Sequence, residues 1–353
     1  MIKEKKSLKG KAPSRRKFFK TAAATGVAAV AATSLSAPAV AKERVEASMV
    51  ATWPRDFPGL GTGAQRLAQR LSDMSDGRIQ VTYYAANERV KAFDSFDEVA
   101  SGNSQMYHGA DYYWVKKHPA FGYFTAVPFG FTYAEMNAWL KYAGGQELWD
   151  ELTDDFGTQS FAAGNTGVQM GGWFNKKIRS ANDFKGLKMR VPMQEVFIQT
   201  ARAFGANPQE LAAIDIYQAL QTGVIDGQDN PPSNIWDFKM YEVSKYLTVT
   251  NYATGPDPFI VNLKWYNTLP PELKIIFDRV AKEAIAKSDQ MNREKESEYL
   301  DMLSKHLKIN YISGKDLIPF QEAVKPVYNY FINKGMFTMA EIKEAQKIAK
   351  QKN

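Results

Sequence analysis

The sequence predicts an α/β fold, because segments with strand periodicity alternate with segments of helical periodicity along the chain. The alternation is clearest at residues 47–84 and 186–230, and the pattern becomes mostly helical after Pro271. Strand, helix and strand in succession favour a parallel sheet. The stretch from residue 42 to 353 exceeds what one hydrophobic core usually serves, so two domains are expected.

The first unit is expected to begin with a strand at residues 47–53, followed by a helix and a second strand at residues 79–84. Apolar residues recur at helical spacing between these strands, and a turn at 75–78 separates the helix from the second strand. An amphipathic segment is predicted next at residues 93–99, and a short strand at 105–108. A helix is expected at 134–142, followed by strands at 161–164 and 168–174.

The most informative stretch begins with an arginine set in a short apolar strand. Apolar residues alternate from Leu187 to Val191, so Arg190 is expected on the face opposite Leu187, Met189 and Val191. An arginine among apolar neighbours needs an anion as a partner. This pattern predicts a binding site for a small carboxylate.

A helix and another strand follow. Asp215 is expected to cap a helix that carries Ile216, Tyr217 and Leu220 on one face, and Gly223 is expected to end it. Residues 224–226 are expected to be a strand that leads into a polar cluster at 227–230. Open α/β sheets bind ligands at the carboxyl ends of their strands, so Arg190 and Asp229 are predicted to lie together.

The carboxyl-terminal region is expected to contain one long helix. Leu273, Ile276, Phe277 and Val280 form a single apolar stripe after Pro271. The stripe fits a helix that crosses both domains of one chain, and it fits equally a helix exchanged between two chains of a dimer.

The amino terminus indicates export. Residues 14–20 form a twin-arginine sequence, SRRKFFK, and a mildly apolar run to Leu35 follows. Residues 39–41, Ala-Val-Ala, match the small-residue cleavage rule, so the mature protein is expected to begin at Lys42. An uncleaved membrane anchor is the alternative, but the run is Ala-rich, is broken by Gly26 and Pro38, and is shorter than the roughly 20 apolar residues of a membrane span.

Charge and cysteine content exclude several classes of function. The first 41 residues carry nine lysines or arginines and one acid, so their removal changes the formal net charge from +7 to −1. The basic pI therefore belongs to the targeting segment, and nucleic-acid binding is not expected. Cysteine is absent. Disulfides, thiolate metal sites and a cysteine nucleophile are excluded.

Four segments carry a resemblance to a known family. NDFKGLKMRVP at 182–192, GANPQEL at 205–211, DIYQALQTGVIDGQDNP at 215–231 and VNLKWYNTLPPELK at 261–274 resemble the DctP-type solute-binding proteins of TRAP transporters. The segments at 51–68, 127–132, 144–152 and 163–180 are most similar to the subgroup that binds 2-oxo and 2-hydroxy monocarboxylates.

The resemblance implies a two-lobed periplasmic clamshell that binds an acid such as pyruvate or lactate without turning it over, and then docks on sodium-driven membrane subunits. Lobe I is expected at residues 42–165 with parts of 252–290, and lobe II at 166–251 with carboxyl-terminal helices at 291–353. A homodimer with exchanged helices is slightly favoured. The protein is expected to be a transport component rather than an enzyme, located in the periplasm, with no organic cofactor.

The resemblance also implies the site residues. The arginine that matches Arg190 pairs bidentately with the ligand carboxylate, a geometry that lysine does not offer. A sodium or calcium ion beside the ligand is held by oxygen donors that match Gln169 and Asp229, with Asn230 as a further candidate. Asp229 and Asn230 stand where some 2-oxo acid binders have glutamate and an aromatic residue, so the metal and the ligand stay open.

Other candidates for ligand contact come from turns and aromatic residues. Asn165 and Gln169 bracket a glycine-rich turn and can offer amides to the ligand, although ordinary turn chemistry explains them equally well. Asn165 and Asn230 are expected to complete the polar shell around the ligand. Trp53, Tyr112 and Tyr113 can wall the apolar end of the ligand, although most aromatic residues at such positions are simply core.

Two rival functions follow from other features. Residues 59–64, GLGTGA, lie between a strand and a helix, but they lack the full dinucleotide fingerprint, and Pro54 and Pro58 crowd the turn. An exported nucleotide-dependent oxidoreductase is therefore a remote alternative. The three histidines, His108, His118 and His306, are scattered, which argues against a hydrolase or zinc site. A TRAP binding protein for another organic acid is the nearer alternative.

Overall fold

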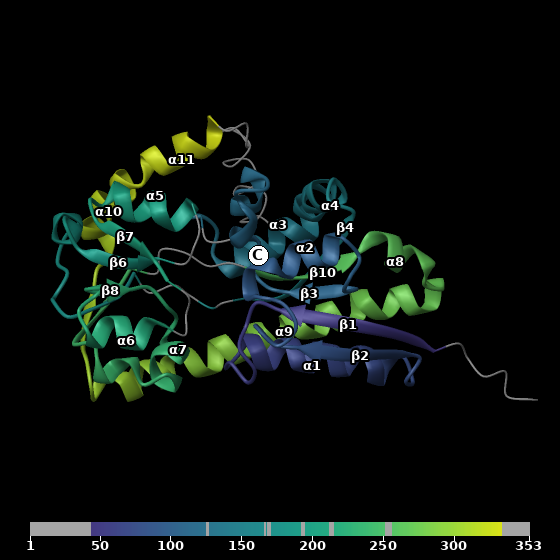
Figure 1. Ribbon diagram of the computed structural model, residues 1–353. Helices are drawn as coiled ribbons and strands as arrows, with labels where there is room; N and C mark the ends of the chain where they lie inside the picture. The colour runs from purple at the N-terminus through teal and green to yellow at the C-terminus, as the bar shows by residue number, and fades with distance from the viewer. Residues whose placement is uncertain are drawn as a thin grey trace, which may run out of the picture. The chain divides into compact units, whose positions relative to one another are not determined.

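The structure is a computed structural model that describes residues 44–124, 127–165, 167, 171–191, 195–211, 215–250 and 256–333. Residues 43–353 form one compact unit. The twin-arginine segment and its cleavage site lie outside the described residues, and so does Gln169. Within the described part, the strands form two sheets, of five and six strands (Figure 1).

The first sheet has the strand order β2-β1-β3-β10-β4. Strand β1 pairs in parallel with both β2 and β3, whereas β10 is antiparallel to β3 and β4. The predicted strand, helix and strand at the start of the chain are therefore confirmed as a parallel unit. The strands are β1 Val45–Ala51, β2 Ile79–Tyr84, β3 Met106–His108, β4 Thr158–Asn165 and β10 Pro256–Asn262.

Among the described residues, five α-helices accompany the first sheet: α1 Leu60–Met74, α2 Ser95–Ala100, α3 Tyr133–Tyr142, α4 Gly145–Asp154 and α8 Leu263–Thr268. Helix α1 buries the predicted stripe of Ala64, Leu67, Ala68 and Leu71. Helix α3 begins with a capping box between Thr132 and Glu135. The ring of Phe124 stacks on Trp139 of α3 and Trp149 of α4.

The second sheet has the order β11-β9-β5-β8-β6-β7. Strand β6 lies between β7 and β8 and is parallel to both, while β5 is antiparallel to β8 and β9. Its strands are β5 Trp173–Phe174, β6 Lys188–Val191, β7 Asn207–Glu210, β8 Gly227–Gln228, β9 Tyr246–Val249 and β11 Lys308–Tyr311. Its helices are α5 Glu195–Ala203, α6 Ile216–Gln221, α7 Pro232–Asp237, α10 Ile318–Ala323 and α11 Lys325–Ile332.

Helix α9, Pro271–Ser304, connects the two halves. It packs on α1, β4 and α7 (Figure 1). Its first turns enter the hydrophobic core beside the first sheet through Leu273, Phe277 and Val280, and Leu303 near its end joins a core cluster of the second sheet. The predicted long helix is confirmed. In the described residues, no helix is both long and apolar enough to cross a membrane.

Three local predictions were wrong. The strand expected at residues 168–174 is limited in its described part to β5, Trp173–Phe174, because Gly171 and Gly172 have positive φ angles and lie outside the strand. Residues 224–226 do not form a strand: Val224 is exposed, and the strand β8 consists only of Gly227–Gln228. Gly223 has a left-handed backbone conformation, and pairing with β5 and β6 begins only at Gly227. Asp215 stands at the start of α6 but its side chain makes no capping hydrogen bond, because its backbone is already helical.

Candidate functional site

Arg190 is held by the central strand of the second sheet. It lies on β6, between β7 and β8, and its side chain is buried. Its neighbours Leu187, Met189 and Val191 belong to one hydrophobic core cluster. The short strand thus places a guanidinium group inside the protein, next to the point where β8 ends.

In the part of the chain that the structure describes, the guanidinium group of Arg190 has few hydrogen-bond partners. Its Nε donates to the carbonyl oxygen of Leu211 at 3.0 Å. Among the described residues, no acidic side chain lies within the 4.0 Å of a salt bridge to Arg190. Burial lowers the pKa of Arg190 from its ordinary value, while the charges of Tyr113, Tyr112 and Asp229 act in the opposite direction. A buried cation in this position strongly favours an anionic ligand.

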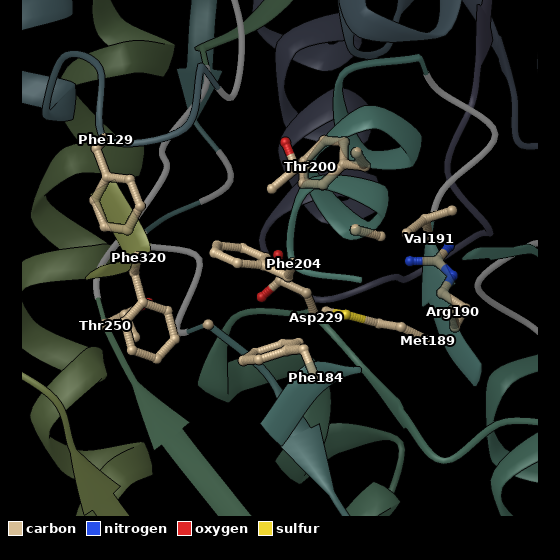
Figure 2. Close-up of a pocket in the computed structure, with 13 residues that line it drawn as sticks. Phe129, Phe184, Met189, Arg190, Val191, Thr200, Phe204, Asp229, Thr250 and Phe320 are labelled. Atoms are coloured by element: carbon tan, nitrogen blue, oxygen red, sulfur yellow. The ribbon is translucent and has the colours of Figure 1, made fainter. Parts of the chain in front are cut away.

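Arg190 and Asp229 line one cavity, as the two strand ends predicted. Figure 2 shows Arg190 with Met189 and Val191 on one side, Phe129 and Phe320 on the other, and Asp229 between them. The cavity has a volume of about 20 Å³, which suits one water molecule or a methyl group. Its remaining wall is mostly aromatic or small, with Gly171, Phe184, Phe197, Thr200, Ala201, Phe204 and Thr250.

The polar cluster after β8 is internally hydrogen-bonded. The Asn230 amide donates to Gln228 Oε1, and its Oδ1 accepts from Asn234 at 3.0 Å. The carbonyl oxygen of Asn230 accepts from the indole of Trp173 at 2.7 Å. Asn230 therefore braces the loop that carries Asp229, and its role as a ligand or metal contact stays a prediction.

Asn165 is bound to helix α9. Its amide donates to Asp289 Oδ1 at 2.5 Å, and its Oδ1 accepts from the backbone of Gly167 at 2.9 Å and from Asn292. The hydrogen-bonding groups of the Asn165 side chain are therefore occupied by the backbone just after β4 and by residues in the middle of α9. Ligand contact by Asn165 stays a prediction, and Gln169 lies outside the described residues.

The three aromatic residues predicted to wall the ligand, Trp53, Tyr112 and Tyr113, are not among the described residues that line the Arg190 cavity, so their ligand contact stays a prediction. Tyr112 packs edge-on against Phe197, with ring centres 5.7 Å apart, and Phe197 lines the cavity. Burial raises the pKa of both tyrosines, that of Tyr113 to about 12. The rings of Trp53 and Tyr113 are tilted against each other, with centres 6.2 Å apart, and Trp53 donates its indole N–H to His108 Nδ1 at 2.9 Å. The tyrosines thus connect the first half of the fold to the arginine site.

Sequence reasoning missed two buried carboxylic acids beside these tyrosines. Asp111 accepts hydrogen bonds from Trp149 and Tyr107, and burial raises its pKa to about 7. Asp257, at the start of β10, is fully buried as well. The only sequence signal for Asp257 was an acidic residue between two prolines at the start of an apolar strand. The cavity phenylalanines gave no signal that separated them from ordinary core.

The fold consists of two β-sheets with their helices, joined by the long helix α9, and it buries an arginine at a strand end. These features are typical of a solute-binding protein. A model of the family DctP, bacterial extracellular solute-binding protein, family 7, matches residues 49–334. The chain belongs to this family, and the resemblance to the solute-binding proteins of TRAP transporters is confirmed.

Relatives of known ligand class support this placement. A protein of Nostoc sp. named as a monocarboxylate 2-oxoacid-binding periplasmic protein is 34% identical over 281 residues, which cover 76% of this chain and 75% of that protein. The C4-dicarboxylate-binding periplasmic protein DctP of Rhodobacter capsulatus is 28% identical and covers 81% of this chain and 86% of its own length.

Solved structures have the same fold. A TRAP periplasmic solute-binding protein from Pseudoalteromonas atlantica, with bound sodium and pyruvate, superposes with a TM-score of 0.78 at 32% identity. One from Colwellia psychrerythraea, with bound calcium and pyruvate, gives a TM-score of 0.78 at 30% identity. Each comparison covers 88% of this chain and 94% of the other. The predicted two-lobed α/β fold is confirmed.

Proposed function

We propose that this protein captures a small monocarboxylate, a 2-oxo or 2-hydroxy acid such as pyruvate or lactate, and delivers it to TRAP membrane subunits. The observation that carries the proposal is Arg190, a buried cation with no acidic partner among the described residues. The names of the Nostoc relative and of the two pyruvate-bound structures support the ligand class.

Arg190 supplies the anchor for the carboxylate. A planar guanidinium group can donate two parallel hydrogen bonds to the two carboxylate oxygens, which fixes both the position and the orientation of the ligand. The Nε of Arg190 is engaged with Leu211, so its side chain is already oriented before a ligand arrives. Little conformational entropy is then lost on binding.

Closure of the lobes completes the site. The arginine comes from the second sheet, while Tyr112 and Tyr113 follow β3 of the first sheet. A ligand that contacts both sets of groups favours the closed arrangement, because only that arrangement makes all of the contacts. We propose that lobe I and lobe II have the boundaries expected from the sequence and that the closed form docks on the membrane subunits. A homodimer with exchanged helices is part of the same proposal.

A sodium or calcium ion fits the site through oxygen donors. Asp229 and Thr250 line the same cavity as Arg190, and carboxylate and hydroxyl oxygen atoms suit these ions. Among the described residues, no group of three or more histidine, cysteine or acidic side chains gathers to form a metal site. Asp229 would therefore hold the ion together with the ligand itself and with Gln169 and Asn230. A bound ion would favour acids that carry an oxygen next to the carboxylate.

The chain is proposed to bind its ligand without chemical turnover. His108 is buried, accepts a hydrogen bond from Trp53 and has a pKa lowered by burial to about 4, which suits a structural role. Export through the twin-arginine pathway to the periplasm, with cleavage before Lys42, is part of the same proposal. The relatives named for C4-dicarboxylates make another organic acid the second candidate.

Thermal unfolding of the protein from Lys42 onward, with a panel of acids, tests the proposal. A ligand that binds only the folded state must raise the transition temperature. Pyruvate, lactate and longer 2-oxo acids are expected to stabilise the protein, and succinate and sialic acid are not. Each acid is measured with calcium and with EDTA, and loss of the shift in EDTA indicates a divalent ion at Asp229. Stabilisation by succinate alone would contradict the monocarboxylate assignment and indicate a dicarboxylate ligand.

A further inference from the structure

The loop at residues 127–132 brings one aromatic side chain from the first half of the fold into the Arg190 cavity. The loop leads into α3, which accompanies the first sheet. Among the described residues that line the cavity, Phe129 alone belongs to this half, and all the others lie between positions 171 and 320, around the second sheet. Its ring lies on the side of the cavity opposite Arg190 (Figure 2). A ligand that fills the cavity therefore meets the first half of the fold at this ring.

The backbone of the loop forms a turn that does not favour phenylalanine. The amide of Gly130 donates to the carbonyl oxygen of Val127 at 2.9 Å, which closes a β-turn with Pro128 and Phe129 at its centre. Phe129 has a φ angle of 53°, in the left-handed region. Proline suits the second position of such a turn, whereas a positive φ angle at the third position is usually adopted by glycine or asparagine. A bulky side chain in this conformation is strained, and such strain is concentrated at ligand clamps and switches.

Helix α11 holds the turn in place from the other half of the fold. The hydroxyl group of Tyr328 donates to the carbonyl oxygen of Pro128, 200 positions earlier in the chain. Burial raises the pKa of Tyr328 to about 12, so the hydroxyl group keeps its proton and remains a donor. Tyr328 and Phe129 both pack against the hydrophobic cluster that contains Met189 and Val191 of β6. The turn is therefore fixed to the element that carries Arg190.

A packing role alone does not account for the strained residue. Phe131, two positions further along the same loop, packs on Trp139 with ring centres 5.6 Å apart, and it is not among the described residues that line the cavity. Its φ angle is not positive. Phe129 is only half-buried. Glycine would form the turn without strain, so the ring of Phe129 is expected to have a use of its own.

We propose that Phe129 is a specificity-determining residue whose ring packs on the carbon chain of an acid anchored at Arg190, and that Tyr328 is the positioning residue that holds the ring there. The cavity volume of about 20 Å³ suits the methyl group of a three-carbon acid. Because the ring and the arginine come from different halves, a ligand that contacts both favours the closed arrangement. The inference rests on the proposed function, because it requires a carboxylate on Arg190.

Calorimetric titration with pyruvate and oxamate tests the contact. The two anions have nearly the same shape, but oxamate has an amide nitrogen where pyruvate has its methyl group. An amide placed against a phenyl ring loses water without gaining a good partner, so the wild type is expected to prefer pyruvate by at least about tenfold. Phe129→Gly, which suits the turn but lacks the ring, should bring that ratio to within about threefold. Phe131→Ala is the matched control from the same loop and should leave the ratio unchanged.

A double-mutant cycle tests whether Tyr328 acts through Phe129. Tyr328→Phe removes only the hydroxyl group and is expected to weaken pyruvate binding by about three- to tenfold. The same substitution made in Phe129→Gly should have no further effect on affinity, because the ring that Tyr328 positions is gone. Tyr311→Phe, which changes an exposed tyrosine of β11, is the control and should bind pyruvate like the wild type.

The outcomes separate this inference from the proposed function. A folded Phe129→Gly variant that keeps the wild-type ratio overturns the inference, and Phe129→Asn is judged by the same criterion if the glycine variant does not fold. Equal losses from Tyr328→Phe in both backgrounds overturn the positioning role of Tyr328. A wild type that binds both anions equally, with Arg190→Ala abolishing both, overturns the inference but leaves the carboxylate anchor standing. Failure of the wild type to bind either anion overturns both proposals.

Discussion

The hydrogen bond between Trp53 and His108 forms only when the His108 imidazole is neutral. The imidazole Nδ1 accepts the Trp53 indole hydrogen at 2.9 Å, so this nitrogen carries no proton. Burial lowers the pKa of His108 from 6.5 to about 4. Protonation would place two donors against each other inside the core, and the pair therefore makes folding sensitive to acid.

We predict that the protein loses stability as the pH falls from about 6.5 to about 4. In this range the unfolded chain binds a proton at His108 and the folded protein does not, so acid favours unfolding. The contribution is about 3 kcal/mol at most. Urea unfolding at pH 7 and pH 4.5 measures it, with His108→Asn as the variant that keeps an acceptor and cannot titrate. Equal acid sensitivity of the variant and the wild type would contradict the assignment.

The sequence predicted some site residues better than others for physical reasons. Arg190 and Asp229 were predictable because strand periodicity and the geometry of parallel sheets place strand ends together. The bonds of Asn165 to Asp289 and Asn292 join residues more than 120 positions apart and leave no local pattern. The full burial of Asp257 is a property of packing, which only the structure shows.

At the scale of elements, strand β8 depends on the absence of a side chain at Gly227. A Cβ there would lie 2.1 Å from Cδ1 of Phe174 on the neighbouring strand β5 and 2.9 Å from the Trp173 carbonyl oxygen. Only glycine lets β8 approach β5 this closely, and β8 in turn leads directly into Asp229.

Gly227→Ala is expected to destabilise the protein by about 3 kcal/mol, because the added methyl group must displace the Phe174 ring and the backbone. Gly63→Ala in α1 is the control, since an added Cβ there meets nothing within 4 Å. The control should be neutral or more stable by up to about 1 kcal/mol. Chemical unfolding of both variants checks this, and a Gly227→Ala variant as stable as the wild type would show that β5 and β8 do not approach so closely.

Long elements were predictable, whereas the two-residue strand β8 was not. The apolar stripe of α9 extends over several turns, so its helical period was clear. Strand β8 has only two residues, too few to show any period, and its position is fixed by pairing with β5 and β6. The capping role of Asp215 failed for a related reason, because cap geometry depends on the backbone angle rather than on residue type.

At the scale of the whole molecule, α9 joins hydrophobic cores that belong to different sheets. Its first part packs with Phe259 and Val261 of β10, and its end packs with Leu247 of β9. Asn165, at the end of β4, is bonded to the middle of the same helix. Helix α9 therefore couples the end of β4 in the first sheet to the core of the second sheet.

The proposed export through the twin-arginine pathway depends on the amino-terminal segment. We predict that replacing both Arg15 and Arg16 by lysine leaves the full-length chain in the cytoplasm, because the pathway recognises the arginine pair. Fractionation of bacteria that express each form, with detection of the chain cut before Lys42, checks the prediction. A Lys9→Arg variant serves as the control. Undiminished periplasmic protein after the double substitution would point to a different export route.

Calorimetric titration of pyruvate into the wild type, Arg190→Lys and Arg190→Ala tests the central claim most directly, which is that a buried arginine anchors the ligand carboxylate. Arg70→Ala, which removes an exposed salt bridge to Glu283, controls for general loss of an arginine. We predict that Arg190→Ala weakens binding by about 100-fold or more, that Arg190→Lys weakens it by at least about tenfold, and that Arg70→Ala has no effect. Folded Arg190 variants that bind pyruvate as tightly as the wild type would contradict the claim.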